Sequence, residues 1–134
     1  MSDHAVSQTD ATRAAPVTLD PVRFSHFLSL VPDALRVALL DQLGADLRQA
    51  AAEVAAAWTA PTDWDLLRRP CHSLVGLAGT IGADAVRAAA WTLGEAARAR
   101  DLGRATAAQD RLIRAEAALL AEVGAARHRA AARA

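Results

Sequence analysis

The 134-residue chain has no lysine, no tyrosine and a single cysteine. Cys71 therefore cannot form an intramolecular disulfide bond, which fits a reducing compartment. No apolar run approaches the roughly 20 residues that a membrane-spanning helix needs. The first residues also lack the basic start and apolar stretch of a secretory signal. These absences predict a cytoplasmic protein with no membrane segment.

β-Branched residues are sparse, whereas alanine occurs 36 times. Alanine is the best helix former, and sheets are enriched in β-branched and aromatic residues. The length suits one ordinary domain with a single core and leaves little room for a second. The composition therefore predicts an all-α domain.

Fifteen acidic residues balance fifteen basic ones, and every basic residue is arginine. This balance argues against a protein that binds polyanions in bulk, and the Arg-His-Arg stretch at 127–129 lacks interleaved aromatic residues. No nucleic-acid partner is therefore predicted. The charge is nevertheless uneven, because residues 1–67 hold four cations and nine anions (−5), and residues 68–134 hold eleven and six (+5).

The spacing of apolar residues predicts a series of helices joined by short connections. In chain order they are a short helix over 20–31, a long helix from Pro32 to Pro61, a helix from Thr62 or Asp63 to Gly82, a helix that carries Val86 and runs into a turn at 101–103, and a last helix that carries Leu112 and Val123. Short connections make consecutive long helices antiparallel. The predicted fold is an antiparallel up-down four-helix bundle with an additional short N-terminal helix.

The bundle is expected over residues 20–127. Residues 1–19 mix polar residues and alanine without an apolar period, so they are predicted to be a flexible N-terminal tail. Residues 128–134 are predicted to be a frayed C-terminal tail.

The helix before Gly82 carries the most regular apolar stripe of the chain and an unusual polar face. The stripe consists of Trp64, Leu67, Cys71, Leu74, Ala78 and Ile81. Residues three, four and seven positions from a given residue share its helical face. The residues on the face of His72 are Arg68, Arg69, Val75, Gly76 and Gly79. His72 is therefore predicted to point into solvent, between guanidinium groups and two positions without a side chain.

This face suits one kind of chemistry. Each glycine inside a helix costs about 1 kcal/mol relative to alanine, so clearance beside His72 is expected to serve a purpose. Neutral imidazole is nucleophilic at cellular pH, and nearby arginines can stabilise an arriving phosphoryl group. A phosphoryl group on His72, and a second protein that approaches closely, would both need the clearance.

A metal or haem bundle is the main competing use of four helices. A di-iron carboxylate bundle requires a Glu followed three residues later by His, and covalent haem requires Cys-x-x-Cys-His. Neither pattern occurs in the chain. No metal site and no cofactor of the chain's own are therefore predicted.

The residues around His72 resemble the histidine-containing phosphotransfer (HPt) domain family. Its pattern, H-x-L-K-G-x-[AS]-x-x-x-G, is matched by His72, Leu74, Gly76, Ala78 and Gly82. Asp63-Trp64 looks like the start of the family's phosphoacceptor helix, and the segment 93–98 is similar to the one that follows it. The resemblance covers roughly residues 20–125.

The resemblance implies a role in a multistep, bacterial-type two-component phosphorelay. His72 would accept a phosphoryl group from the aspartyl phosphate of a receiver domain and pass it to another receiver. The Mg²⁺ would belong to the receiver, and the chain would be a phosphotransfer intermediate rather than a kinase. Its expected partners are response-regulator receiver domains and a hybrid or sensor histidine kinase, and it is expected to be a monomer.

One position departs from the family pattern, because Val75 stands where the family has lysine. Arg68 and Arg69 lie on the same face and are expected to supply the missing positive charge to the phosphoryl group. The alternative is an HPt-like adaptor that binds or sequesters receiver domains and cannot be phosphorylated.

Overall fold

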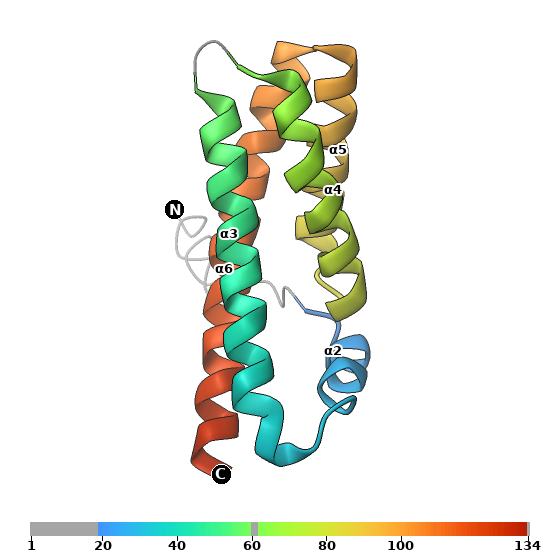
Figure 1. The fold of residues 1–134 in the computed structure, drawn as a ribbon. Helices are drawn as coiled ribbons and strands as arrows, with labels where there is room; N and C mark the ends of the chain where they lie inside the picture. The colour runs from blue at the N-terminus through green and yellow to red at the C-terminus, as the bar shows by residue number, and fades with distance from the viewer. Residues whose placement is uncertain (1–18, 60–61, 134) are drawn as a thin grey trace, which may run out of the picture.

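The computed structural model describes residues 19–59 and 62–133. The helices in these ranges are α2 (Pro21–Leu28), the short 3₁₀ helix η1 (Asp33–Leu35), α3 (Arg36–Trp58), α4 (Trp64–Ile81), α5 (Asp84–Ala99) and α6 (Leu102–Arg133). The four long helices lie antiparallel to their neighbours in the chain, and α2 lies at the end of α4 (Figure 1). The predicted all-α bundle with a short N-terminal helix is confirmed.

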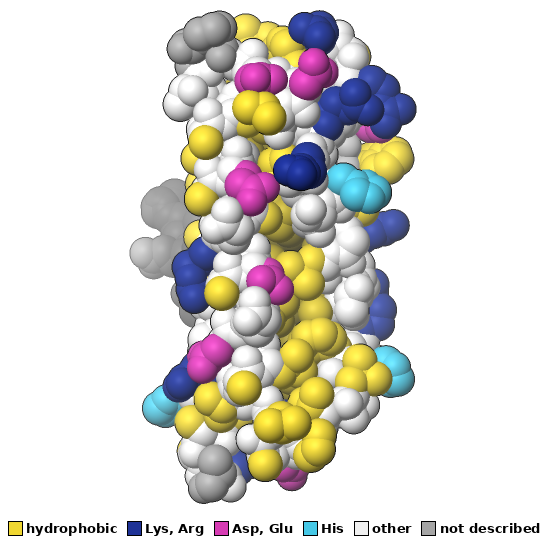
Figure 2. Space-filling model, viewed as in Figure 1, with side chains coloured by type: hydrophobic (Ala, Val, Ile, Leu, Met, Phe, Trp, Pro, Cys, Tyr) yellow, Lys and Arg dark blue, Asp and Glu magenta, His cyan; other side chains and the backbone are white. Residues whose placement is uncertain are grey.

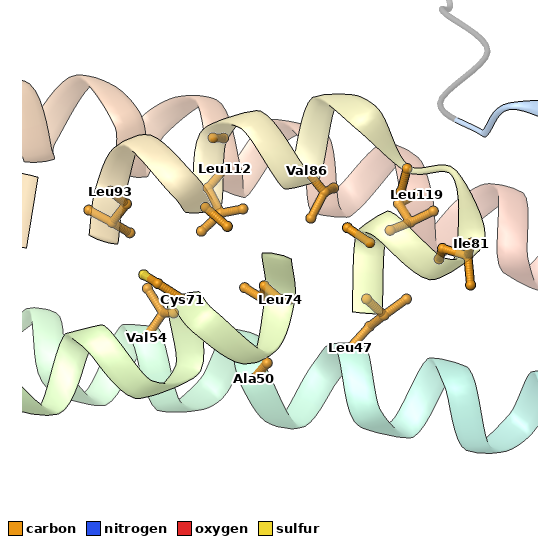
Figure 3. Close-up of a cluster of buried hydrophobic side chains, with 14 of the residues drawn as sticks. Leu47, Ala50, Val54, Cys71, Leu74, Ile81, Val86, Leu93, Leu112 and Leu119 are labelled. Carbon is orange, nitrogen blue, oxygen red and sulfur yellow. The ribbon is translucent and has the colours of Figure 1, made fainter. Parts of the chain in front are cut away.

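The core is built from one apolar face of each long helix. Leu47 of α3, Leu74 of α4, Leu93 of α5 and Leu119 of α6 are all fully buried. Their side chains point toward one another in the middle of the bundle (Figure 3). Many of the other buried positions are alanines, which let the helices approach closely. None of the helices in the described ranges is long and apolar enough to cross a membrane.

The ends of α4 follow the sequence prediction. Asp63 is the N-cap, and its side-chain Oδ1 accepts a hydrogen bond from the backbone N–H of Leu66 at 3.0 Å. At the other end, Gly82 adopts a left-handed conformation with φ 80°, which glycine tolerates best. Pro70 lies inside α4 and is buried, and the helix continues through it.

The short helix α2 is fastened to the turn that follows α4. The backbone N–H of Asp20 donates a hydrogen bond to the carbonyl of Gly82 at 2.8 Å. Arg23 of α2 donates two hydrogen bonds to the carboxylate of Asp84, at 2.8 and 2.7 Å. Phe24 is buried in the core. We call this arrangement of Asp20, Arg23 and Phe24 on the Gly82 turn the α2 clasp.

The corner between α5 and α6 differs from the predicted turn at 101–103. Arg100 has φ 53° and ends α5, and α6 already begins at Leu102. The side chain of Asp101 accepts a hydrogen bond from the backbone N–H of Arg104 at 3.1 Å, so it caps α6. A capping aspartate thus determines where the helix starts, although Gly103 suggested a turn.

Two further boundaries differ from prediction. The helix expected to start at Pro32 begins with η1, which moves Leu35 to the surface and makes Leu40 the first buried residue of α3. α6 continues to Arg133, where a frayed tail over 128–134 was predicted. Alanine is the best helix former, and arginine is favourable near the negative helix end. The predicted tail at 1–19 lies outside the described residues except for Leu19, which is buried.

Candidate functional site around His72

His72 lies near the middle of α4 with its side chain exposed to solvent. Leu74, Ala78 and Ile81 of the same helix are fully buried. The apolar stripe therefore holds one face of α4 against the bundle, and His72 stands on the other face. This orientation of His72 agrees with the prediction from helical spacing.

The imidazole lies in a groove between α4 and α5. The α4 side of the groove contains Arg68, Arg69, Val75 and the imidazole itself. The α5 side contains Trp91, Gly94, Glu95 and Arg98. Helical spacing within α4 does not predict that these residues of another helix lie at this site. Only the packing of α5 against α4 shows that these residues face His72.

Two arginines of the groove, Arg68 and Arg69, form no ion pair with a carboxylate of the described residues. The two acidic residues of the groove lie next to other arginines: Asp65 is 4.0 Å from Arg100, and Glu95 is 3.6 Å from Arg98. No hydrogen bond or ion pair joins the side chain of Arg68 or Arg69 to another residue of the described chain. Figure 2 shows arginine side chains gathered over the upper half of α4, with a histidine among them. Both arginines are therefore available to an anion that reaches the groove.

The two glycines beside His72 have different surroundings. A Cβ atom added to Gly76 would meet nothing within 4 Å, so this part of the helix surface is open. A Cβ atom added to Gly79 would lie 3.5 Å from Cδ and Nε of Arg87, which reaches over from α5. The predicted clearance therefore exists at Gly76, while Gly79 is covered by a third arginine of this face.

Val75 is half-buried and lines the groove beside His72. An isopropyl group offers neither a charge nor a hydrogen-bond donor. Any positive charge close to the imidazole must therefore come from a neighbouring arginine.

Two polar residues of α6 lie in the core, where helix periodicity places apolar residues. Gln109 and Glu116 are 8% and 6% exposed, and each has a side-chain oxygen without a hydrogen-bond partner in the described chain. Burial raises the pKa of Glu116 to about 7. Their spacing in phase with Leu112 and Leu119 was the available sequence signal for their burial.

Cys71 precedes His72 but points into the core. Burial, with a smaller contribution from the charge of Glu116, raises the pKa of its thiol to about 12. The thiol therefore stays protonated at neutral pH, as expected for a packing residue. No cluster of three or more His, Cys, Asp or Glu side chains suited to a metal ion occurs in the ranges 19–59 and 62–133.

Comparison with known proteins gives one match. The family model described as Hpt domain matches residues 34–128, which span η1, α3, α4, α5 and most of α6. No curated protein and no solved structure matches the chain.

Proposed function

The chain belongs to the Hpt domain family, which implies histidine phosphotransfer in a phosphorelay, and we propose that His72 is the residue that carries the phosphoryl group. The observation that carries this proposal is the solvent-exposed imidazole on α4, beside the open surface at Gly76 and two arginines that pair with no acidic side chain of the described residues. The donor and the acceptor are receiver domains. A hybrid or sensor histidine kinase would supply the phosphoryl group to the first receiver.

The proposed transfer is a substitution at phosphorus. The unprotonated ring nitrogen of His72 attacks the phosphorus of an aspartyl phosphate on the receiver. A nitrogen–phosphorus bond forms, the phosphorus–oxygen bond to the aspartate breaks, and the aspartate leaves as a carboxylate. The other ring nitrogen releases its proton to solvent. Transfer to the next receiver reverses these steps, and the Mg²⁺ that assists them is bound by the receiver.

Arg68 and Arg69 are proposed to stabilise the phosphoryl group during this transfer. They lie one helical turn before His72 on the same groove, and neither is held by an acidic side chain in the described chain. Hydrogen bonds between arginine and phosphoryl oxygens are charge-assisted and stronger than neutral ones. They would take over the role of the lysine that Val75 replaces.

The proposal is tested with a receiver domain that carries radioactive phosphate on its aspartate. Label should move to the chain and should be lost in acid but kept in base, as expected for phosphohistidine. The His72→Gln variant should take up no label. His128→Gln is the matched control, because it changes an exposed histidine of α6 and should leave labelling unchanged.

The adaptor is the second candidate function, and the apolar side chain of Val75 in the place of the family lysine favours it. An adaptor would bind the receiver without taking up label. Binding without label in the wild-type chain would therefore replace the proposed function by that of a receiver-binding adaptor.

The double variant Arg68→Ala/Arg69→Ala is expected to lower the rate of transfer from the receiver to His72 by about tenfold or more, which corresponds to about 1.4 kcal/mol in the barrier. The rate is measured in single-turnover reactions with excess receiver. Arg111→Ala removes an exposed arginine of α6 outside the groove and should transfer at the wild-type rate. An unchanged rate in the double variant would exclude this role for both arginines.

A further inference from the structure

Trp91 is the one aromatic residue among the strongly exposed large apolar side chains of the described chain. Its side chain on α5 is 59% exposed, whereas Trp58 and Trp64 are partly buried against the core. An exposed indole beside the His72 groove is a candidate contact for a partner protein, because tryptophan is enriched at protein–protein interfaces.

Trp91 connects the His72 groove to a second hollow on the same face. The second hollow lies between α4 and α5 and is lined by Val75, Arg87, Ala88, Trp91 and Thr92. Val75 and Trp91 line both hollows. A protein that covers His72 closely enough to exchange a phosphoryl group would therefore also cover Trp91.

The charge next to Trp91 indicates what such a protein should present. Arg87 borders the second hollow, and its side chain lies over Gly79. Within the described ranges, no carboxylate pairs with Arg87. The second hollow therefore has apolar side chains on its surface and an arginine that pairs with no carboxylate of the described residues. A partner protein that fits it would present an apolar side chain next to a carboxylate.

We propose that Trp91, together with Arg87, determines which receiver domain docks on this chain. The indole packs against an apolar side chain of the receiver, and the guanidinium of Arg87 binds a neighbouring carboxylate. Tryptophan and arginine are enriched among the residues that dominate binding energy at protein interfaces. This inference rests on the proposed function, because it takes the partner to be a receiver domain that exchanges phosphate with His72.

The test uses two phosphate donors of different size. The first is a panel of receiver domains from the same organism, each phosphorylated with acetyl phosphate. The second is phosphoramidate, a small donor that labels histidine without protein docking. Transfer from the receiver that reacts fastest with the wild type is then compared in Trp91→Ala, Arg87→Ala and Arg87→Lys.

Trp91→Ala should lower kcat/KM for transfer from this receiver at least tenfold, and Arg87→Ala should lower it about fivefold with partial recovery in Arg87→Lys. Labelling by phosphoramidate should stay at the wild-type rate in all three. Ile113→Ala is the matched control, because Ile113 is 57% exposed on α6 and lies outside both hollows. It should leave both reactions unchanged.

Two results would overturn the inference. One is receiver transfer within twofold of the wild-type rate in Trp91→Ala. The other is an equal loss with both donors, because Trp91 would then act on His72 itself. Failure of the proposed function gives a different result, namely no labelling of wild-type His72 by either donor. In that case the dissociation constant of the unphosphorylated receiver, measured for wild type and Trp91→Ala, still decides whether the indole anchors it.

Discussion

The Gly82→Ala variant is expected to be less stable than the wild type by about 3 kcal/mol, from backbone strain and overpacking together. Gly82 has φ 80°, a conformation that L-residues rarely adopt. An added Cβ atom would also lie 2.8 Å from Cβ of Asp20 and 3.1 Å from Cβ of Arg23. These atoms belong to the α2 clasp and cannot rotate away, so α2 itself would have to move. The free energy of unfolding is measured by urea titration followed by circular dichroism.

Two further variants separate the effect of the contact with α2 from the effects of an added methyl group and of backbone strain. Gly124→Ala adds the same methyl group inside α6, where nothing lies within 4 Å, and should raise stability by about 0.5–1 kcal/mol. Gly82→Asn relieves the backbone strain in part, because asparagine tolerates the left-handed conformation, but it keeps the Cβ clash. Wild-type stability of Gly82→Asn would show that the approach of α2 does not restrict position 82.

The stability of the protein is expected to fall as the pH rises from about 5 to about 8, because of Glu116. Burial raises the pKa of this carboxyl to about 7 in the folded chain from 4.5, its ordinary value. The folded state therefore holds a proton on Glu116 that the unfolded state has already released, and this contribution to stability is lost as the pH passes 7. The loss from this residue amounts to about 3 kcal/mol.

Glu116→Gln should remove this part of the pH dependence, because the amide does not ionise. The difference in unfolding free energy between variant and wild type is measured from pH 5 to pH 8, and it should grow in favour of the variant. Glu53→Gln, which changes an exposed glutamate on α3, should follow the wild-type curve. Parallel curves for wild type and Glu116→Gln would contradict the assignment.

Much of the fold was predictable because the helix signals are local. The apolar stripe of α4, the capping aspartate at 63 and the glycine at 82 each specify one end or one face of a helix without reference to the rest of the chain. The boundary errors have local causes as well. Asp101 caps α6, so the helix begins at Leu102 and includes Gly103, where a turn was predicted. The 3₁₀ helix η1 changes which residues of this segment face the core, so Leu35 is exposed.

The α4 half of the site was predictable for the same reason, and the α5 half was not. His72, Arg68 and Gly76 share a face through helical spacing alone. Trp91 and Arg87 reach that face only through the packing of α5 on α4, which depends on how the two helices are rotated about their axes. No spacing rule within one helix gives this rotation, so the second hollow could be found only in the structure.

Gly76 and Gly82 differ in which other residues the fold would accept at their positions. Alanine at position 76 would meet no atom within 4 Å and would favour the helix by about 1 kcal/mol. Position 82, by comparison, must stay glycine for as long as the α2 clasp packs there. In a descendant that no longer docked to any partner, position 76 would drift to a better helix former while position 82 stayed unchanged. Packing within the chain therefore requires glycine at position 82, whereas nothing within the chain requires it at position 76.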